Sequence, residues 1–180
     1  ENFKLGDKQQ SHIIVGTYAP NMKSEERYIF NIINSVLSGM GGRLFIELRD
    51  KKSLAYSVTS FFTPGLDHGY FGIYIGCSPS KKLESINSIN NELEKLLNNG
   101  ISESEIENAK NSLIGKNDIS LQRNAAINSR ISIPYLYGLD PNEPFSFAKK
   151  IRSINKAEVD FVIQKFLDKT NFVTVSVDPN

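Results

Sequence analysis

The stretch Gly41–Val58, GGRLFIELRDKKSLAYSV, is the most informative part of the chain. Apolar residues in its first half repeat at helical spacing, which predicts a short helix over Arg43–Lys51. The residues that follow are rich in β-formers and predict a strand over Tyr56–Phe62. A helix that leads directly into a strand indicates a domain in which helices and a sheet form separate layers.

Other strand and helix signals lie on both sides of this stretch. Tyr70–Gly76 is a second strand, and the turn-rich TPGLDHG between it and Tyr56–Phe62 predicts a hairpin. Further strands are predicted over His12–Tyr18 and Phe172–Val177. Helical periodicity marks Ser24–Leu37, Ser80–Leu97, Ser102 to about Tyr137, Pro144–Arg152 and Lys156–Leu167. We therefore expect an α+β fold, a mostly antiparallel sheet with helices packed on one face.

Two helix boundaries have specific signals. The glycines of SGMGG (Ser38–Gly42) predict a break after the first long helix. Ser102 and Glu105 form the S-x-x-E pattern of a capping box, which predicts the start of another long helix. Within that helix Gly115 is a weak point, and Pro134 predicts a kink or break.

Length and composition bound the class of protein. The chain has 180 residues, of which 39% are apolar and 23% charged, with a formal net charge of +1. These values suit one globular domain, and the charge predicts neither a nucleic-acid nor a membrane partner. No apolar run approaches the roughly 18 residues of a membrane span. We expect residues 1–10 to be a linker or inter-domain strap and residues 11–180 a single domain, part of a longer protein.

The sequence lacks the residues of a metal or nucleophile site. A zinc-peptidase helix carries H-E-x-x-H or H-x-x-E-H, whereas His12 and His68 stand alone in a strand and a turn. A cysteine nucleophile needs a histidine base beside it, and the sequence places none next to Cys77. We therefore expect no metal ligand and no catalytic base in this chain.

Two features are candidates for binding. Gly39, Gly41 and Gly42 of SGMGG do not follow a phosphate-loop pattern, so a helix break or a close backbone approach is the favoured interpretation. Tyr56 follows Arg49 by seven positions. A guanidinium and a phenol are donors suited to a carbonyl oxygen or an oxyanion. The ordinary alternative is a solvated arginine at a helix end and a tyrosine that only packs.

At these residues the sequence resembles the C-terminal domain of the pitrilysin/insulinase family of zinc metallopeptidases, which includes mitochondrial processing peptidase. The resemblance covers nearly the whole chain. It runs from NSVLSGMGGRLFIELRDKKSLAYSV through GYFGIYIGCSP, ELEKLLNNGISESEIENAKNSLIG and LQRN to YLYGLDP and the terminal strand. The GGRLF-ELRDK-SLAY run is its most specific part. The Arg–Tyr pair, RDKKSLAY and LQRN favour the fourth domain of the family over the second.

The resemblance implies a metalloprotease-domain fold and a role. Such proteins have four related domains, and another domain carries zinc and the catalytic Glu. The domains close like a clamshell over an extended peptide, and Arg49 and Tyr56 match a pair that reaches the scissile carbonyl. The glycines 39, 41 and 42 match a substrate-handling loop. The implied partners are a catalytic-half domain, of the same or a paired chain, and a peptide substrate, with zinc on that partner. The isolated chain should be inactive alone.

Two other functions stay open at this stage. A non-enzymatic scaffold or assembly subunit of the same fold would use Arg49 and Tyr56 structurally. An unrelated α+β module for a small ligand would have a closed apolar pocket. The peptidase interpretation predicts instead an open, concave face with Arg49 and Tyr56 at its rim.

Overall fold

The structure is a computed structural model that describes residues 1–4 and 9–179. Within these residues one sheet has the strand order β1-β5-β2-β4-β3. Its strands are β1 (Asn2–Lys4), β2 (Ser11–Ala19), β3 (Ala55–Thr63), β4 (Gly69–Cys77) and β5 (Val173–Asp178). Only the β1–β5 pair is parallel. The predicted strands and the hairpin are confirmed, and so is the mostly antiparallel sheet.

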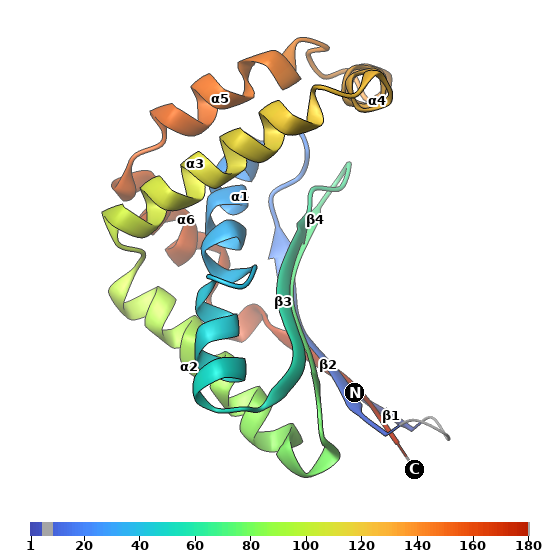
Figure 1. Cartoon of the computed structure of the whole chain (residues 1–180), viewed down its shortest axis with the longest axis vertical. Helices are drawn as coiled ribbons and strands as arrows, with labels where there is room; N and C mark the ends of the chain where they lie inside the picture. Colours follow the sequence, from blue (N-terminus) through green and yellow to red (C-terminus); the bar gives the residue numbers. More distant parts are fainter. Residues whose placement is uncertain (5–8, 180) are drawn as a thin grey trace.

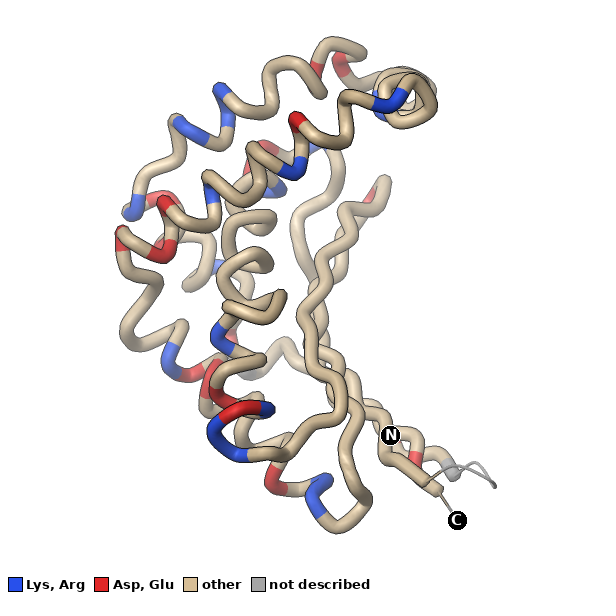
Figure 2. The backbone as a smooth tube through the Cα atoms, in the orientation of Figure 1, with Lys and Arg blue, Asp and Glu red and all other residues tan. Residues whose placement is uncertain are grey.

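The helices lie against one face of this sheet and leave the other face uncovered (Figure 1). They are α1 (Glu26–Leu37), η1 (Phe45–Lys51), η2 (Pro79–Lys81), α2 (Lys82–Asn99), α3 (Glu103–Ser120), α4 (Asn124–Leu136), α5 (Glu143–Ser153), α6 (Lys156–Phe166) and η3 (Lys169–Asn171). Figure 2 shows charged positions along the helices and almost none on the strands. The predicted α+β class, with helices on one face, is confirmed.

The core lies between the helices and the sheet. Burial alternates along β2, so Ile13 and Val15 face the helices while Ile14 between them is 43% exposed. Phe30 and Ile33 of α1 are fully buried opposite them. Each large apolar side chain buried in this way contributes roughly 1.5–3 kcal/mol. The helical face of the sheet is therefore the face that stabilises the domain.

One predicted helix is divided in two. The capping box of Ser102 and Glu105 is confirmed at the start of α3. The expectation that this helix reaches Tyr137 is wrong, because α3 ends at Ser120 and α4 begins at Asn124. Arg130 of α4 donates to the Oδ1 of Asn117 and, at 3.0 Å, to the Oγ of Ser120. These side-chain contacts hold α4 against the end of α3.

Pro134, the residue expected to break the helix, lies inside the last turn of α4. Proline has no N–H to donate to the carbonyl of Arg130, and α4 ends two residues later at Leu136, whereas the break between α3 and α4 comes before it. The break therefore follows tertiary contacts and not the proline.

Part of the expected linker belongs to the sheet. The amino group of Glu1 donates to the carbonyl of Thr174 at 3.0 Å, and the Ser176 N–H donates to the carbonyl of Glu1 at 2.9 Å. Ser176 also donates its hydroxyl to Asn2 at 2.7 Å. These bonds hold β1 against β5, although its residues show no strand pattern. Residues 5–8 of the expected strap lie outside the described residues.

Candidate functional site

The connection from η1 to β3 is a short, tightly bonded turn. Leu48 is fully buried and Leu54 is nearly so, which holds both ends of the turn on the core. The Leu54 N–H donates to the carbonyl of Leu48 at 2.8 Å, and the Ser53 N–H to the carbonyl of Arg49 at 3.0 Å. Ser53 has φ = 51°, the left-handed conformation that such a reversal requires. The chain thus turns within a few residues from helix to strand.

Two lysines form hydrogen bonds between this turn and neighbouring segments. Lys81 donates from Nζ to the carbonyl of Ser53 at 2.8 Å. Lys52 donates from Nζ to the Oγ of Ser88 on α2 at 2.9 Å. The backbone between Arg49 and Tyr56 is therefore held in place from both sides.

Arg49 lies in the second half of η1 and is exposed. Its guanidinium carbon lies 4.9 Å from the centre of the Phe45 ring. No ion pair to Arg49 occurs in the part of the chain that the structure describes. The predicted helix is present, but its turns are π-helical. Such turns are rare and occur frequently at functional sites.

Tyr56 lies on a β-bulge at the start of β3. Ala55 pairs with Cys77 and Ser57 pairs with Gly76, so Tyr56 between them has no partner on β4. Its side chain is 60% exposed, and its hydroxyl lies 3.5 Å from the Oγ of Ser78. That distance is at the outer limit of a hydrogen bond, so the phenol can donate elsewhere. Bulges commonly redirect a side chain in this way.

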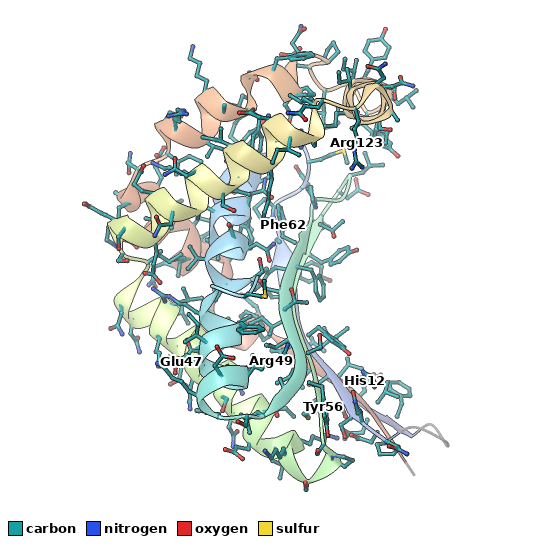
Figure 3. The ribbon with its side chains drawn as sticks, viewed as in Figure 1. His12, Glu47, Arg49, Tyr56, Phe62 and Arg123 are labelled. Atoms are coloured by element: carbon teal, nitrogen blue, oxygen red, sulfur yellow. The ribbon has the colours of Figure 1, made fainter. Side chains whose placement is uncertain are left out.

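Arg49 and Tyr56 lie in the same part of the molecule, where η1 runs into β3 (Figure 3). The structure places both on the exposed surface, one at the end of the helix and one at the start of the strand. Among the described residues, Arg49 has no ion pair, and the Tyr56 hydroxyl has the long contact of 3.5 Å with Ser78. This arrangement suits the recognition of an oxygen atom on a ligand.

The glycine loop lies at the opposite end of η1. Gly39 has φ = 84°, and a Cβ on Gly42 would lie 2.4 Å from the carbonyl oxygen of Ser38. Both positions therefore need glycine to end α1, whereas a Cβ on Gly41 would meet nothing within 4 Å. With α3 the loop lines an open groove of about 530 Å³. The glycines and the Arg49–Tyr56 pair are separate features.

An ion pair that the sequence did not predict joins the residues just before η1 to α3. Arg43 donates from Nε to Glu105 Oε1 at 2.6 Å, from Nη2 to Glu105 Oε2 at 2.7 Å and from Nη2 to the carbonyl of Gly100 at 3.3 Å. Mainly because of this guanidinium, the pKa of the Glu105 carboxyl falls to about 2. Glu105 was predicted only as the third residue of the capping box. The sequence has no signal for its long-range partner.

The residues that could bind a metal do not come together. The Nδ1 of His12 lies 2.8 Å from the hydroxyl of Tyr74, and His68 lies in the exposed loop after β3. Cys77 is fully buried, and burial raises the pKa of its thiol, which lowers its reactivity. Within residues 1–4 and 9–179 no three His, Cys, Asp or Glu side chains form a metal-binding group. The described residues therefore do not fit a zinc site.

The uncovered face of the sheet has one apolar hollow. Its volume is about 460 Å³, and its floor is formed where Gly16 of β2 pairs with Gly72 of β4. Tyr18, Tyr70 and Val173 stand around it and are exposed. The hollow is open, unlike the closed pocket expected of a small-ligand module. In the part of the chain described here, no helix is long and apolar enough to cross a membrane.

These features define a class, an α+β domain whose described residues hold no metal centre. Residues 2–113 match the family model described as the peptidase M16 inactive domain. A zinc protease of Streptomyces coelicolor, itself uncharacterized, is 30% identical over 93% of this chain and 37% of its own length. An uncharacterized zinc protease of Bacillus subtilis is 32% identical over 70% of this chain and 30% of its length. The chain belongs to the peptidase M16 family, as its inactive, C-terminal type of domain.

Solved structures share the fold. The peptidase M16 inactive domain from Pseudomonas fluorescens matches with a TM-score of 0.90 at 23% identity. The matched region is 99% of this chain and 42% of the Pseudomonas chain. The inactive peptidase domain from Bordetella parapertussis has a TM-score of 0.84 at 18% identity, over 97% of this chain and 94% of that one. The chain spans about a third of the length of the curated relatives. The resemblance to a zinc-metallopeptidase family is confirmed.

Proposed function

We propose that this chain is the noncatalytic domain of a zinc metalloendopeptidase that closes over an extended peptide. In this role Arg49 and Tyr56 donate hydrogen bonds to the scissile carbonyl. The observation that carries the proposal is the pair of exposed donors, a guanidinium without an ion pair and a bulged tyrosine, on a rigid helix–strand turn. Membership of the M16 family supports it, because relatives are named zinc proteases.

The chemistry follows from the charge that develops during peptide hydrolysis. Attack on the carbonyl carbon places negative charge on the carbonyl oxygen, and donors fixed in advance stabilise that charge. The turn holds the backbone of both residues, so little reorganisation is needed when the domains close. Zinc belongs on the catalytic partner domain, which would be a domain of the same or a paired chain. The peptide substrate is part of the same proposal.

The test uses the whole protease that contains this domain. Arg49→Ala and Tyr56→Phe should each lower kcat by about 10²–10³, the usual loss for one oxyanion donor. Arg123→Ala is the control, because Arg123 is also exposed but lies just before α4, at another place in the fold (Figure 3). The kcat of this control should stay within about twofold of the wild type.

Two results would contradict the proposal. If kcat stays within about threefold in both variants, the pair does not act on the transition state. If the complete protein cleaves no peptide but still assembles with a partner subunit, the scaffold function holds instead. A peptide-cleaving protein whose KM alone changes would place the two residues in substrate binding without a role in the transition state.

A further inference from the structure

Within residues 1–4 and 9–179, the contact of the Arg49 side chain is with an aromatic ring and not with a carboxylate. The guanidinium carbon lies 4.9 Å from the centre of the Phe45 ring, four residues earlier on η1. A cation over an aromatic ring is held by the ring's negative face. A ring is not a carboxylate acceptor, so this contact leaves the guanidinium N–H groups able to donate to a ligand oxygen. An ion pair with a carboxylate would instead occupy them.

Arg43, on the same segment, forms such an ion pair with a carboxylate. It uses its Nε and Nη2 atoms on Glu105 and Gly100, and these donors are not available to a ligand. Its guanidinium is held by hydrogen bonds, whereas that of Arg49 lies over the Phe45 ring. Two arginines six positions apart are therefore fixed by different means.

We infer that Phe45 is a positioning residue that aligns the Arg49 guanidinium while keeping its donors free for the substrate carbonyl. This inference rests on the proposed function. A free arginine side chain must lose rotamer freedom to bind, and stacking removes part of that freedom in advance. Phe45 itself is half-buried beside the fully buried Leu44 and Leu48, so the ring has a fixed base. Its chemistry calls for an aromatic ring at position 45 and not merely an apolar side chain.

The stacking can be tested first in this chain by NMR, without any activity. The solved inactive peptidase domain from Bordetella parapertussis has nearly the same length as this chain, so a domain of this fold can be studied by itself. The Hε and Hδ protons of Arg49 should resonate upfield of those of exposed Arg123, because the ring lies beneath them. Phe45→Leu should move them to the Arg123 position, and Phe45→Tyr should not. If the wild-type protons already match those of Arg123, the stack is absent and the inference is wrong, whatever the enzyme does.

The second test uses the complete protease and a double-mutant cycle. Phe45→Leu should lower kcat/KM by about 2- to 5-fold, the range of an exposed cation–π contact. Phe45→Tyr should restore it, and Phe45→Leu should have no effect in an Arg49→Ala background. Phe145→Leu is the matched control, because Phe145 on α5 is 60% exposed and should not change kcat/KM.

The outcomes separate the two proposals. If Arg49→Ala lowers kcat and Phe45→Leu costs the same factor with and without Arg49, Phe45 acts elsewhere and the positioning role is wrong. If Arg49→Ala leaves kcat unchanged, the proposed function fails and the positioning role fails with it. The upfield Arg49 resonance would then mark a purely structural contact.

Discussion

The two ends of the segment from Arg43 to Tyr56 contain similar side chains and differ in how these are used. At the first end Arg43 is partly buried and bound to Glu105 of α3 by two short hydrogen bonds. At the second end Arg49 and Tyr56 are exposed; Arg49 lies over the Phe45 ring, and the Tyr56 hydroxyl has a long contact of 3.5 Å with Ser78. Buried, paired groups stabilise a fold, whereas exposed, fixed donors suit a ligand. The difference shows that the role of an arginine in this segment depends on the groups that its side chain contacts.

The largest expected effect comes from the side chain that anchors both ends. Leu48 is fully buried, so Leu48→Ala should lower the free energy of unfolding by about 2–5 kcal/mol. Urea denaturation measures this directly. The neighbouring Ile46 is 38% exposed, and Ile46→Ala should cost less than about 1 kcal/mol. Equal costs at the two positions would show that η1 is not anchored through Leu48.

The next effect separates the two arginines. Arg43→Ala should lower the free energy of unfolding by about 1–2 kcal/mol at neutral pH, because a partly buried carboxylate loses its partner. The pKa of Glu105 is about 2 in the folded state against an ordinary 4.5, so the folded state favours the ionised carboxyl. The stabilisation is complete above pH 4.5 and is lost as the pH falls toward 2.

Denaturation of the wild type and Arg43→Ala from pH 7 to pH 2.5 checks this prediction. The difference between their free energies of unfolding should shrink below about pH 4.5. A difference that stays constant over this range would mean that Arg43 stabilises by packing alone.

A smaller effect of opposite sign is expected in the turn between the two ends. Ser53 has φ = 51°, a conformation that costs a residue with a side chain about 1–2 kcal/mol. Ser53→Gly removes that strain but adds freedom to the unfolded chain, so it should stabilise by about 0.5–1 kcal/mol. Ser57→Gly, in strand β3, should destabilise by a similar amount. Thermal unfolding of both variants shows whether each is more or less stable than the wild type. If Ser53→Gly is less stable, the backbone of Ser53 is not strained.

The smallest effect is predicted at the second end. Arg49→Ala should lower the free energy of unfolding by only about 0.5 kcal/mol, since the side chain is exposed and its contact with the Phe45 ring is a weak one. Urea denaturation of Arg49→Ala and Arg43→Ala under the same conditions compares their free energies of unfolding. A loss above about 1 kcal/mol would make Arg49 a structural residue like Arg43 and would favour the scaffold function.

The sequence by itself determined the features that depend on neighbouring residues. Periodicity located the helix at Arg43–Lys51 and the β3–β4 hairpin, and the S-x-x-E pattern located the start of α3. The GGRLF-ELRDK-SLAY run identified the family. Such signals are readable because the interactions behind them act within a few residues.

Only the tertiary structure decided the features that depend on distant residues. β1 exists because Glu1 and Asn2 meet β5, far along the chain, and α3 ends where Arg130 folds back on Asn117. The same holds for Arg43, whose acidic partner lies 62 positions away. Spacing singled out Arg49 and Tyr56, but only the fold showed that one stacks on a ring and the other sits on a bulge. Contacts between distant residues leave no periodic signal, so packing alone decides them.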